Sequence, residues 1–418
     1  MTIRFVDVYG FAGGFSCGAT QAGMQLVGKK ENKQGFGIAL MEANRKFLGD
    51  TWESQASDPG EWEPVQADVV LGTPPCSAFS SMTAGNAMHG MHSEINNCMR
   101  DIMHYAVKVR PQTIMMESVG QAYTKGLPLM RELTEIVRNG TGIHYHATHV
   151  VQNNWSVGGA SKRKRYFLVL SQAPFGVERV DLGDRLPVLG DAVSDLIDMP
   201  LSWKSQPYVG YSNWYADRFR SASGEVDGHI PAENAYSRRV MDLAKVAWLP
   251  GESEAHVLKR YYEEHQQLPE SWQYPTAGGT TTRDKQLIER NFDAGGFSKP
   301  RHWAWDQPAR VVNGAGSFMI WHPNMRFFTH REVARVMGFP DDWLIAGAKD
   351  KRDLHAYWGK GTSVAPARWV STWAKNSIEG NPGTYTGDPI DDTFDDKLID
   401  VSMDWKPVLK KMQTATAA

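Results

Sequence analysis

The sequence is short of cysteine and has no long hydrophobic run. Its 418 residues include three cysteines, Cys17, Cys76 and Cys98, whose spacing fits neither a disulfide framework nor a paired set of metal ligands. We therefore expect a reducing compartment and no bound metal. No apolar run approaches the roughly 18 residues that cross a bilayer, and the N-terminus shows no basic-then-apolar leader. These absences favour a cytoplasmic protein without a membrane partner.

The sequence also lacks an excess of charge of either sign. Its 45 Lys and Arg residues and 47 Asp and Glu residues leave a formal net charge of −2. That balance gives no electrostatic sign of a nucleic-acid partner, although a local basic patch is compatible with it. With 41% apolar and 22% charged residues, the composition is that of an ordinary globular protein. The chain is long enough for two domains, or for one domain with a large insertion.

Residues 1–171 alternate short β-branched runs with amphipathic helical stretches. This alternation is typical of an α/β fold with a doubly wound, mostly parallel sheet. In such sheets ligands bind beyond the carboxyl ends of the strands. Three segments follow expected strands in this way: "VYGFAGG", "TPPCSAFS" and "ESVGQ". We expect them to converge on one face of the molecule.

The remainder of the chain divides into three parts. Residues 172–303 intersperse prolines, glycines and aromatics, with one amphipathic helix expected near 253–267, and are interpreted as an irregular inserted domain. Regular patterns return in residues 304–380, which we assign to the closing part of the first domain. Residues 381–418 are acidic and rich in turn-forming residues, so we expect a poorly ordered tail.

The stretch "ADVVLGTPPCSAFSSM" puts Cys76 directly after two prolines at the end of an apolar run. Pro74 and Pro75 fix the backbone and withhold two amide donors. A rigid corner at the carboxyl end of a strand directs the next side chain outward, which suits a nucleophile. A lone cysteine more often packs in a core, and the other two cysteines, with helical and apolar neighbours, are interpreted in that way.

Six segments, in this order, resemble the motifs of the DNA (cytosine-5)-methyltransferase family. They are "VDVYGFAGGFSCGATQAG", "GTPPCSAFS", "MMESVG", "SKRKRYFLV", "WDQPARVV" with "HREVARVMGFPDDW", and "GTSVAPARWV". The resemblance covers residues 3–170 and 304–376. It implies a Rossmann-like, S-adenosylmethionine-dependent methyltransferase fold with an inserted target-recognition domain in residues 172–303. It also implies an enzyme that methylates C5 of a flipped-out cytosine in duplex DNA. A single chain carries the complete set of catalytic motifs, so we expect a monomer.

Four residues of these motifs suit cytosine-5 methylation. C5 of cytosine is a poor nucleophile, but addition of the Cys76 thiolate to C6 turns the ring into an enamine that can attack a methyl donor. Glu117 would donate a proton to N3 and accept from the exocyclic amine. Arg163 and Arg165, two apart on one strand, share a face and would hold the base carbonyl and a flanking phosphate. A surface glutamate and a solvated basic strand edge are the alternatives.

The resemblance also implies a site for S-adenosylmethionine. Glycines between the first strand and helix let the backbone approach a cofactor closely. Glu31 matches the acid that binds the ribose hydroxyls in this family, and Asp58 is aligned loosely with the acid that contacts the adenine amine. The expected cofactor-binding residues are Tyr9, Gly10, Phe11, Ala12, Gly13, Gly14, Glu31, Asn32, Asp58, Pro75, Thr362 and Ser363.

A base inside a duplex is out of reach, so the target cytosine must flip out, and the loop after Cys76 is expected to close over it. Arginine and aromatic side chains of the inserted domain are expected to contact phosphates and base edges. For any single one of them, an ordinary loop position is an equally good interpretation. The expected DNA-binding residues are Ser80, Arg218, Arg220 and Arg283.

Several family positions carry shorter polar side chains in this sequence. Hydroxyls replace the usual amides at Ser77, Ser118, Ser161 and Thr362, which reduces reach and hydrogen-bonding capacity. We interpret the chain as a divergent, active enzyme of restriction–modification or phage DNA modification. Three alternatives stay open: a modified adenosylmethionine with a larger transferred group, a tRNA-directed relative, and a non-catalytic DNA-binding module. The C-F-T-x-x-Y signature of the tRNA-directed relatives is not found.

Overall fold

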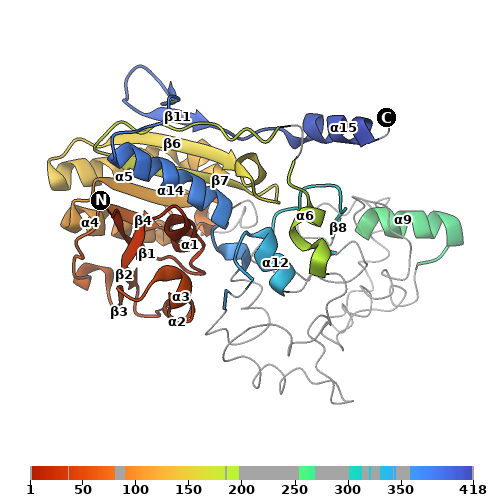
Figure 1. Ribbon diagram of the computed structural model, residues 1–418, viewed down its shortest axis with the longest axis horizontal. Helices are drawn as coiled ribbons and strands as arrows, with labels where there is room; N and C mark the ends of the chain where they lie inside the picture. Colours follow the sequence, from red (N-terminus) through yellow and green to blue (C-terminus); the bar gives the residue numbers. More distant parts are fainter. Residues whose placement is uncertain are drawn as a thin grey trace, which may run out of the picture.

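The computed structural model describes residues 2–35, 37–80, 90–183, 186–196, 254–268, 301–312, 320–321, 330–341, 343–344 and 358–416. Within them, nine strands form one central sheet (Figure 1). In sheet order they are β10 (Asp388–Pro389), β11 (Lys397–Asp400), β6 (His146–Asn153), β7 (Lys164–Ser171), β5 (Thr113–Val119), β4 (Val69–Gly72), β1 (Arg4–Val8), β2 (Gln25–Glu31) and β3 (Glu53–Ala56). β7 runs antiparallel to both neighbours and β10 antiparallel to β11, whereas the remaining pairs are parallel. The predicted doubly wound, mostly parallel sheet is confirmed.

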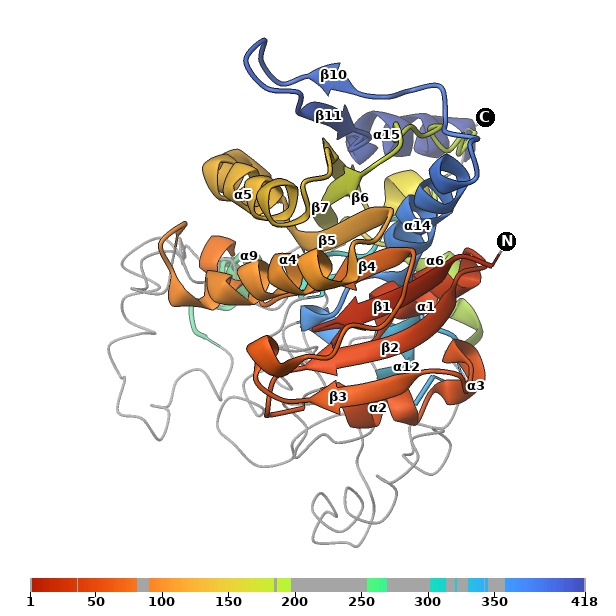
Figure 2. The ribbon, with the colours of Figure 1, turned by 90° about the vertical axis from the view of Figure 1, so that its left-hand side faces the viewer.

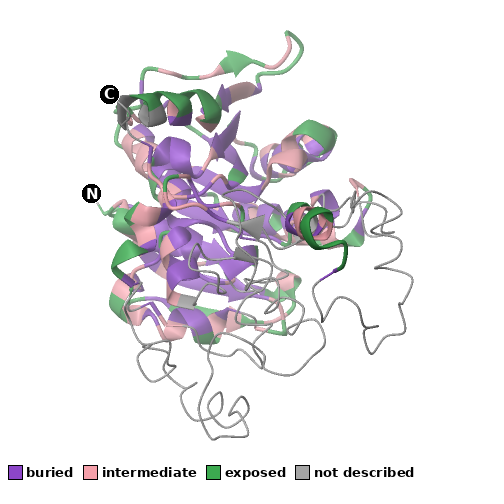
Figure 3. Ribbon diagram, turned by 90° about the vertical axis from the view of Figure 1, so that its right-hand side faces the viewer, coloured by how far each residue is buried: buried purple, intermediate pink, exposed green. Residues whose placement is uncertain are grey.

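Helices cover both faces of this sheet (Figure 2). On one face lie α1 (Gly14–Gln21) and α14 (Val364–Ile378), and on the other lie α4 (Asn97–Val109) and α5 (Gly120–Thr141). The central strands read as apolar runs because they are buried on both faces, and burial is concentrated there (Figure 3). The other elements are α2 (Ile38–Glu42), α3 (Arg45–Leu48), α6 (Leu189–Val193), α9 (Glu254–His265), α12 (His330–Val336), α15 (Trp405–Thr416), and the pair β8 (Arg301–His302) and β9 (Ile320–Trp321).

The strand order reverses direction between β1 and β4. From β1 the chain proceeds to β2 and β3 on one side, and then returns to β4 and β5 on the other side. The loops that leave β1 and β4 therefore diverge at their carboxyl ends. This is the place where open α/β sheets bind ligands.

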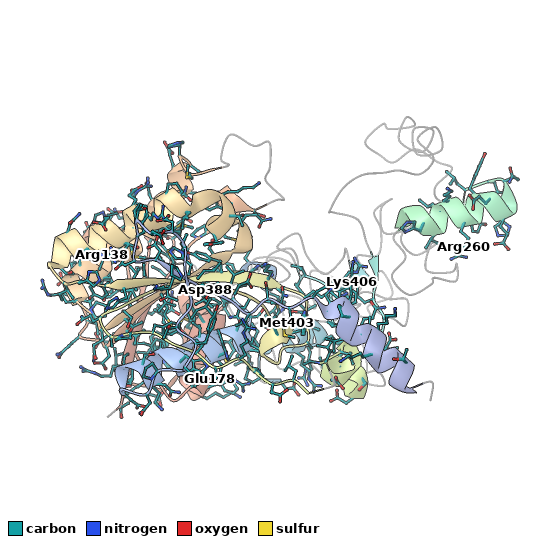
Figure 4. The ribbon with its side chains drawn as sticks, turned by 90° about the horizontal axis from the view of Figure 1, so that it is seen from above. Arg138, Glu178, Arg260, Asp388, Met403 and Lys406 are labelled. Atoms are coloured by element: carbon teal, nitrogen blue, oxygen red, sulfur yellow. The ribbon has the colours of Figure 1, made fainter. Side chains whose placement is uncertain are left out.

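The prediction of a poorly ordered tail over residues 381–418 is wrong. Strand β11 extends the sheet by pairing in parallel with β6 (Figure 1), and Met403 and Lys406 mark the path from there into α15 (Figure 4). The acidic composition suggested a solvated segment, but its carboxylates bind two arginines of α5. The ion pairs join Asp391 and Asp396 to Arg131, and Asp395 to Arg138.

Little of the expected recognition domain falls within the described residues. The helix expected near 253–267 is confirmed as α9, which lies apart from the sheet and carries Arg260 (Figures 1 and 4). Three expected DNA-binding residues lie outside the described part of the chain: Arg218, Arg220 and Arg283. In the described part, no helix combines the length and apolar character needed to span a bilayer.

Candidate active site

Cys76 lies where the sequence placed it, just beyond the carboxyl end of β4. Pro74 is buried and Pro75 is exposed, and both precede a short 3₁₀ turn, Ser77–Phe79, that begins after Cys76. The cysteine has φ −97° and ψ 5°, in the sparsely populated bridge region where many active-site residues are found. The residue as a whole is partly exposed. The corner therefore presents a free thiol at the reversal point of the sheet.

Glu117 and Arg165 form a nearly buried ion pair beside it. Glu117 is in β5 and Arg165 in the antiparallel neighbour β7, two positions from the residue that pairs with Glu117, so the side chains meet diagonally. Arg165 Nε lies 2.6 Å from Glu117 Oε1, and the two residues are 7% and 3% exposed. A carboxylate oxygen has more than one lone-pair direction, so Oε1 can accept a further hydrogen bond beside this contact.

Burial and charge act together on Cys76 and Glu117. Burial raises the pKa of the Cys76 thiol; Arg165 and Arg163 oppose this rise and Glu117 adds to it. Burial likewise raises the pKa of the Glu117 carboxyl, against the effect of the same two arginines. The four predicted catalytic residues thus interact electrostatically, as a shared site requires. A carboxyl with a raised pKa can act as a proton donor closer to neutral pH.

Arg163 is bound differently from Arg165. It is 1% exposed and donates to three main-chain carbonyls, those of Val312, Gly359 and Gly361. The Nη2 donor is 2.8 Å from the latter two oxygens. The sequence predicted that Arg163 would hold a base or phosphate. In the structure Arg163 directly precedes β7 (Lys164–Ser171), and its contacts join this point to Val312 and to the segment before α14.

Replacing Arg163 with lysine should destabilise the protein more than replacing Arg165 with lysine. Lysine lacks the planar fork that reaches three carbonyls, so the change leaves buried acceptors unpaired and should lower the free energy of unfolding by about 2–4 kcal/mol. Chemical denaturation of both variants measures this. Equal losses of stability would contradict a special structural role for Arg163.

The predicted cofactor loop, residues 9–14, has an unusual backbone. Tyr9 and Phe11 adopt positive φ angles of 58° and 46°, and Gly13 has φ 76°. Residues other than glycine rarely adopt this region, and such outliers cluster at functional sites. Gly10 is required for another reason, because a Cβ atom there would lie 2.0 Å from a carboxylate oxygen of Asp7.

The loop after β1 is packed against the segment before α14. A Cβ atom on Gly14 would lie 1.9 Å from the carbonyl oxygen of Thr362. Thr362 and Ser363 are both buried, and Ser363 occupies the N-cap position of α14 without a capping hydrogen bond from its side chain. The two ends of the predicted catalytic domain, far apart in sequence, therefore meet at the expected cofactor residues.

Gly14→Ala should destabilise the protein by about 1–3 kcal/mol, because the clashing atom belongs to the backbone and cannot rotate away. Gly60→Ala is the matched control, since a Cβ atom at Gly60 meets nothing within 4 Å. Its free energy of unfolding should stay within about 0.5 kcal/mol of the wild type. Thermal and urea denaturation of the two variants test this, and a stable Gly14→Ala protein would contradict the close packing.

Beneath the cofactor loop lies a buried charged cluster that the sequence interpretation missed. Glu31, predicted from sequence, is 3% exposed at the end of β2. Lys29 contacts Glu31 at 2.6 Å and Asp7 at 3.1 Å. Lys29 and Glu31 alternate with other residues on one strand, so they share a face. That spacing, together with an acid at the matching point of β1, is the sequence signal that could have revealed the cluster.

The remaining predicted residues lie around the same edge of the sheet. The hydroxyl of Tyr9 donates to Asp101 at 2.8 Å, and Ala12 is buried. Asn32 accepts from the main chain of Gln34. Asp58 is exposed and forms an ion pair with Lys33. Ser80 is partly exposed after the turn that follows Cys76, and residues 81–89 of the expected closing loop lie outside the described part.

One group of possible metal ligands occurs among the described residues. Ligand atoms of His144, His146 and Asp395 lie within 4.8 Å of one another. Arg138 donates to both carboxylate oxygens of Asp395, at 2.9 and 2.8 Å. That carboxylate therefore already has a cationic partner.

Comparison with known proteins gives consistent findings. The sequence pattern of the C-5 cytosine-specific DNA methylase family matches residues 3–372. Type II methyltransferase M.DdeI from Desulfomicrobium norvegicum is 23% identical over 385 residues, covering 87% of this chain and 86% of that protein. Type II methyltransferase M.NgoFVII from Neisseria gonorrhoeae is 22% identical over 354 residues, covering 82% and 79%.

Among solved structures, the fold resembles that of a candidate DNA modification methyltransferase encoded within an E. coli prophage. The TM-score is 0.55 at 16% sequence identity, and the match covers 90% of this chain and 100% of the other. At this identity the likeness concerns the fold alone.

Proposed function

Because the chain belongs to the C-5 cytosine-specific DNA methylase family, we propose that this DNA cytosine methyltransferase works through a covalent adduct between Cys76 and C6 of a flipped-out cytosine. The observation that carries the proposal is that Cys76, beyond the end of β4, is electrostatically coupled to the Glu117–Arg165 ion pair of the neighbouring strands β5 and β7. There a nucleophile, a proton donor and a fixed cation stand together.

Cys76 is the nucleophile. The residue is partly exposed, and its thiol is held on a backbone corner that two prolines make rigid. Burial raises the pKa of this thiol, and the positive charges of Arg165 and Arg163 oppose that rise. They thereby assist formation of the thiolate, the form that attacks C6. A sulfur–carbon bond forms at C6, and the electron pair displaced from the C5–C6 double bond makes C5 nucleophilic.

Glu117 stabilises the charge that this addition puts on the ring. Its raised pKa favours a protonated carboxyl that can donate to N3 of the base, while Oε1 can accept from the exocyclic amine. Arg165 holds the carboxyl in place through the 2.6 Å contact. After C5 is methylated, loss of the C5 proton to a base restores the double bond and expels the Cys76 thiolate.

The residues present fit S-adenosylmethionine as the methyl donor. Glu31 is a buried carboxylate at the carboxyl end of β2 and is suited to accept hydrogen bonds from two ribose hydroxyls. The loop of residues 9–14, with positive φ at Tyr9, Phe11 and Gly13, and the packed segment around Thr362 would enclose the rest of the cofactor. When bound, the cofactor supplies an electrophilic methyl group.

The substrate that this assignment predicts is double-stranded DNA. The reacting atoms of a paired cytosine are covered by its neighbours, so the base must leave the stack to reach Cys76. The expected contacts of Ser80 and of the three recognition-domain arginines with DNA stay predictions.

Mass spectrometry of nucleosides tests the proposal. The purified protein is incubated with S-adenosylmethionine and unmethylated duplex DNA, and in parallel with unmodified tRNA, and both are then digested. We expect a gain of one methylene on deoxycytidine from DNA alone. Methylation of tRNA alone would favour the tRNA-directed alternative. No modification of DNA or tRNA would contradict the proposal.

A further inference from the structure

Lys29 is a fully buried lysine with two acidic partners. Its exposure is 0%, and those of Asp7 and Glu31 are 1% and 3%. The Lys29 ammonium lies 2.6 Å from Glu31 Oε1 and 3.1 Å from Asp7 Oδ1. Lysine is almost never buried to this degree unless it is paired, so these carboxylates account for its position.

The arrangement follows from strand register. Asp7 of β1 pairs directly with Lys29 of β2, and Glu31 lies two residues further along β2 on the same face. The hydroxyl of Ser16 in α1 donates to the second oxygen of Asp7. One ammonium thus ties together the two strands whose carboxyl ends form the expected cofactor site.

The cluster also contacts the cofactor loop. Gly10 lies directly against the Asp7 carboxylate, leaving no room for a Cβ atom. The main-chain amide of Phe11 donates a hydrogen bond to the Glu31 carboxylate, a contact that favours its ionised form. The side chain and charge state of Glu31 are therefore linked to the conformation of the loop.

Lys29 opposes the effect of burial on Glu31. Burial raises the pKa of Glu31 above its ordinary value, and the contact with Lys29 works against that rise. Burial by itself lowers the pKa of Lys29, but Asp7 and Glu31 more than offset this, so its pKa lies above the ordinary value. The lysine therefore stays charged and favours the ionised form of Glu31.

We propose that Lys29 is a positioning residue of the cofactor site, which keeps Glu31 ionised and oriented to accept hydrogen bonds from the vicinal hydroxyls of the cofactor ribose. The inference rests on the proposed use of S-adenosylmethionine. In this proposal Lys29 does not contact the cofactor itself and acts on it only by positioning Glu31.

Removing the positive charge of Lys29 should change how cofactor binding depends on pH, in a defined direction. In Lys29→Met the pKa of Glu31 rises further, because burial and the neighbouring Asp7 carboxylate, which both raise it, are no longer opposed by the ammonium. Below that pKa the carboxyl is protonated, and one oxygen becomes a donor instead of an acceptor. Cofactor binding should therefore be weak at lower pH and strengthen as pH rises, whereas the wild type changes less over the same range.

Calorimetric titration with S-adenosylhomocysteine, the stable product of the cofactor, tests this from about pH 6 to about pH 9, where a strongly raised carboxyl pKa titrates. We expect Lys29→Met to bind at least about tenfold more weakly than the wild type near pH 6, with part of the loss recovered near pH 9. Lys29→Gln, which keeps a donor without the charge, should behave in the same way and serves if the methionine variant does not fold.

Lys30→Met is the matched control. Lys30 is the next residue of β2, is also buried, and donates to Gln55 at 2.7 Å on the opposite face. Its affinity for S-adenosylhomocysteine should equal that of the wild type at every pH. Glu31→Gln should weaken binding at all pH values. The double variant Glu31→Gln, Lys29→Met should bind only slightly more weakly than Glu31→Gln, because the negative charge that Lys29 stabilises is already absent.

The outcomes separate this inference from the proposed function. A Lys29 variant with wild-type affinity, or with an equal loss at every pH, would overturn the positioning role while leaving the proposed function intact. A wild-type protein that does not bind S-adenosylhomocysteine would overturn the proposed cofactor, and this inference with it.

Discussion

Replacing Cys76 with serine should abolish methylation of duplex DNA while leaving cofactor binding unchanged. A serine hydroxyl at this corner keeps the shape of the side chain but is a far weaker nucleophile than a thiolate. Loss of an enzyme nucleophile commonly reduces turnover by about 10⁴-fold or more. Transfer of radiolabelled methyl groups to DNA, measured at saturating cofactor, gives the rate.

The control for this substitution is Cys17→Ala. Cys17 is buried in α1, with a side-chain contact to Gln21 in the same helix, and the account gives it no chemical role. Cys17→Ala should keep the wild-type rate within a few-fold. A Cys76→Ser enzyme that retains a tenth of the wild-type activity would rule out the covalent mechanism.

Replacing Glu117 with glutamine should slow methylation by about 10²–10³-fold, the range typical for loss of a general acid–base group. Glutamine keeps the size and one acceptor, but it has no acidic proton for N3 of the base. Single-turnover kinetics with enzyme in excess over DNA measure the chemical step directly. The adduct with C6 should form more slowly in this variant.

The chain offers a closely matched control for Glu117. Glu132 and Arg100 form an ion pair with the same 2.6 Å contact between Nε and Oε1, but this pair is exposed on α4 and α5. Glu132→Gln should leave the single-turnover rate unchanged, since it perturbs a surface pair of small energetic value. If both glutamine variants slow the reaction equally, or if neither does, Glu117 is not the proton donor.

The residues at the ends of strands were predictable because the signals are local. Cys76 and Glu117 each follow or end an apolar run, and parallel topology then brings such ends together. Their residue types suggest the chemistry, and the order of the motifs along the chain supports the family resemblance. No distant contact is needed to recognise them.

The roles of Arg163 and Lys29 could not be predicted in this way. Arg163 and Arg165 look equivalent in sequence, but Arg163 donates hydrogen bonds to the main-chain carbonyls of Gly359 and Gly361, nearly 200 residues away. From sequence alone, Lys29 looks like a solvent-exposed lysine near the end of a strand. Only the pairing of β1 with β2 shows that Asp7 lies beside it. In both cases the partners come from remote segments, which composition and periodicity do not specify.

The structure of the acidic C-terminal segment also depends on partners that are remote in sequence. Its charge and turn content predicted disorder, but the energetics depend on Arg131 and Arg138 of α5, which face its carboxylates. With those partners, the segment adds a strand to the edge of the sheet. Composition alone cannot distinguish a solvated acid from a paired one.

The most direct test of the covalent Cys76 mechanism is trapping of the enzyme on DNA that contains 5-fluorocytosine. Fluorine at C5 cannot leave as a proton does, so an enzyme that forms the C6 adduct and transfers methyl becomes permanently attached to its substrate. Long duplexes of random sequence are prepared with 5-fluorocytosine in place of cytosine, so the recognised site need not be known. After incubation with S-adenosylmethionine, denaturing electrophoresis and peptide mass spectrometry locate the attachment. We expect a cofactor-dependent cross-link at Cys76 that is absent in Cys76→Ser. A cross-link at another residue, or none in an enzyme that methylates cytosine, would contradict it.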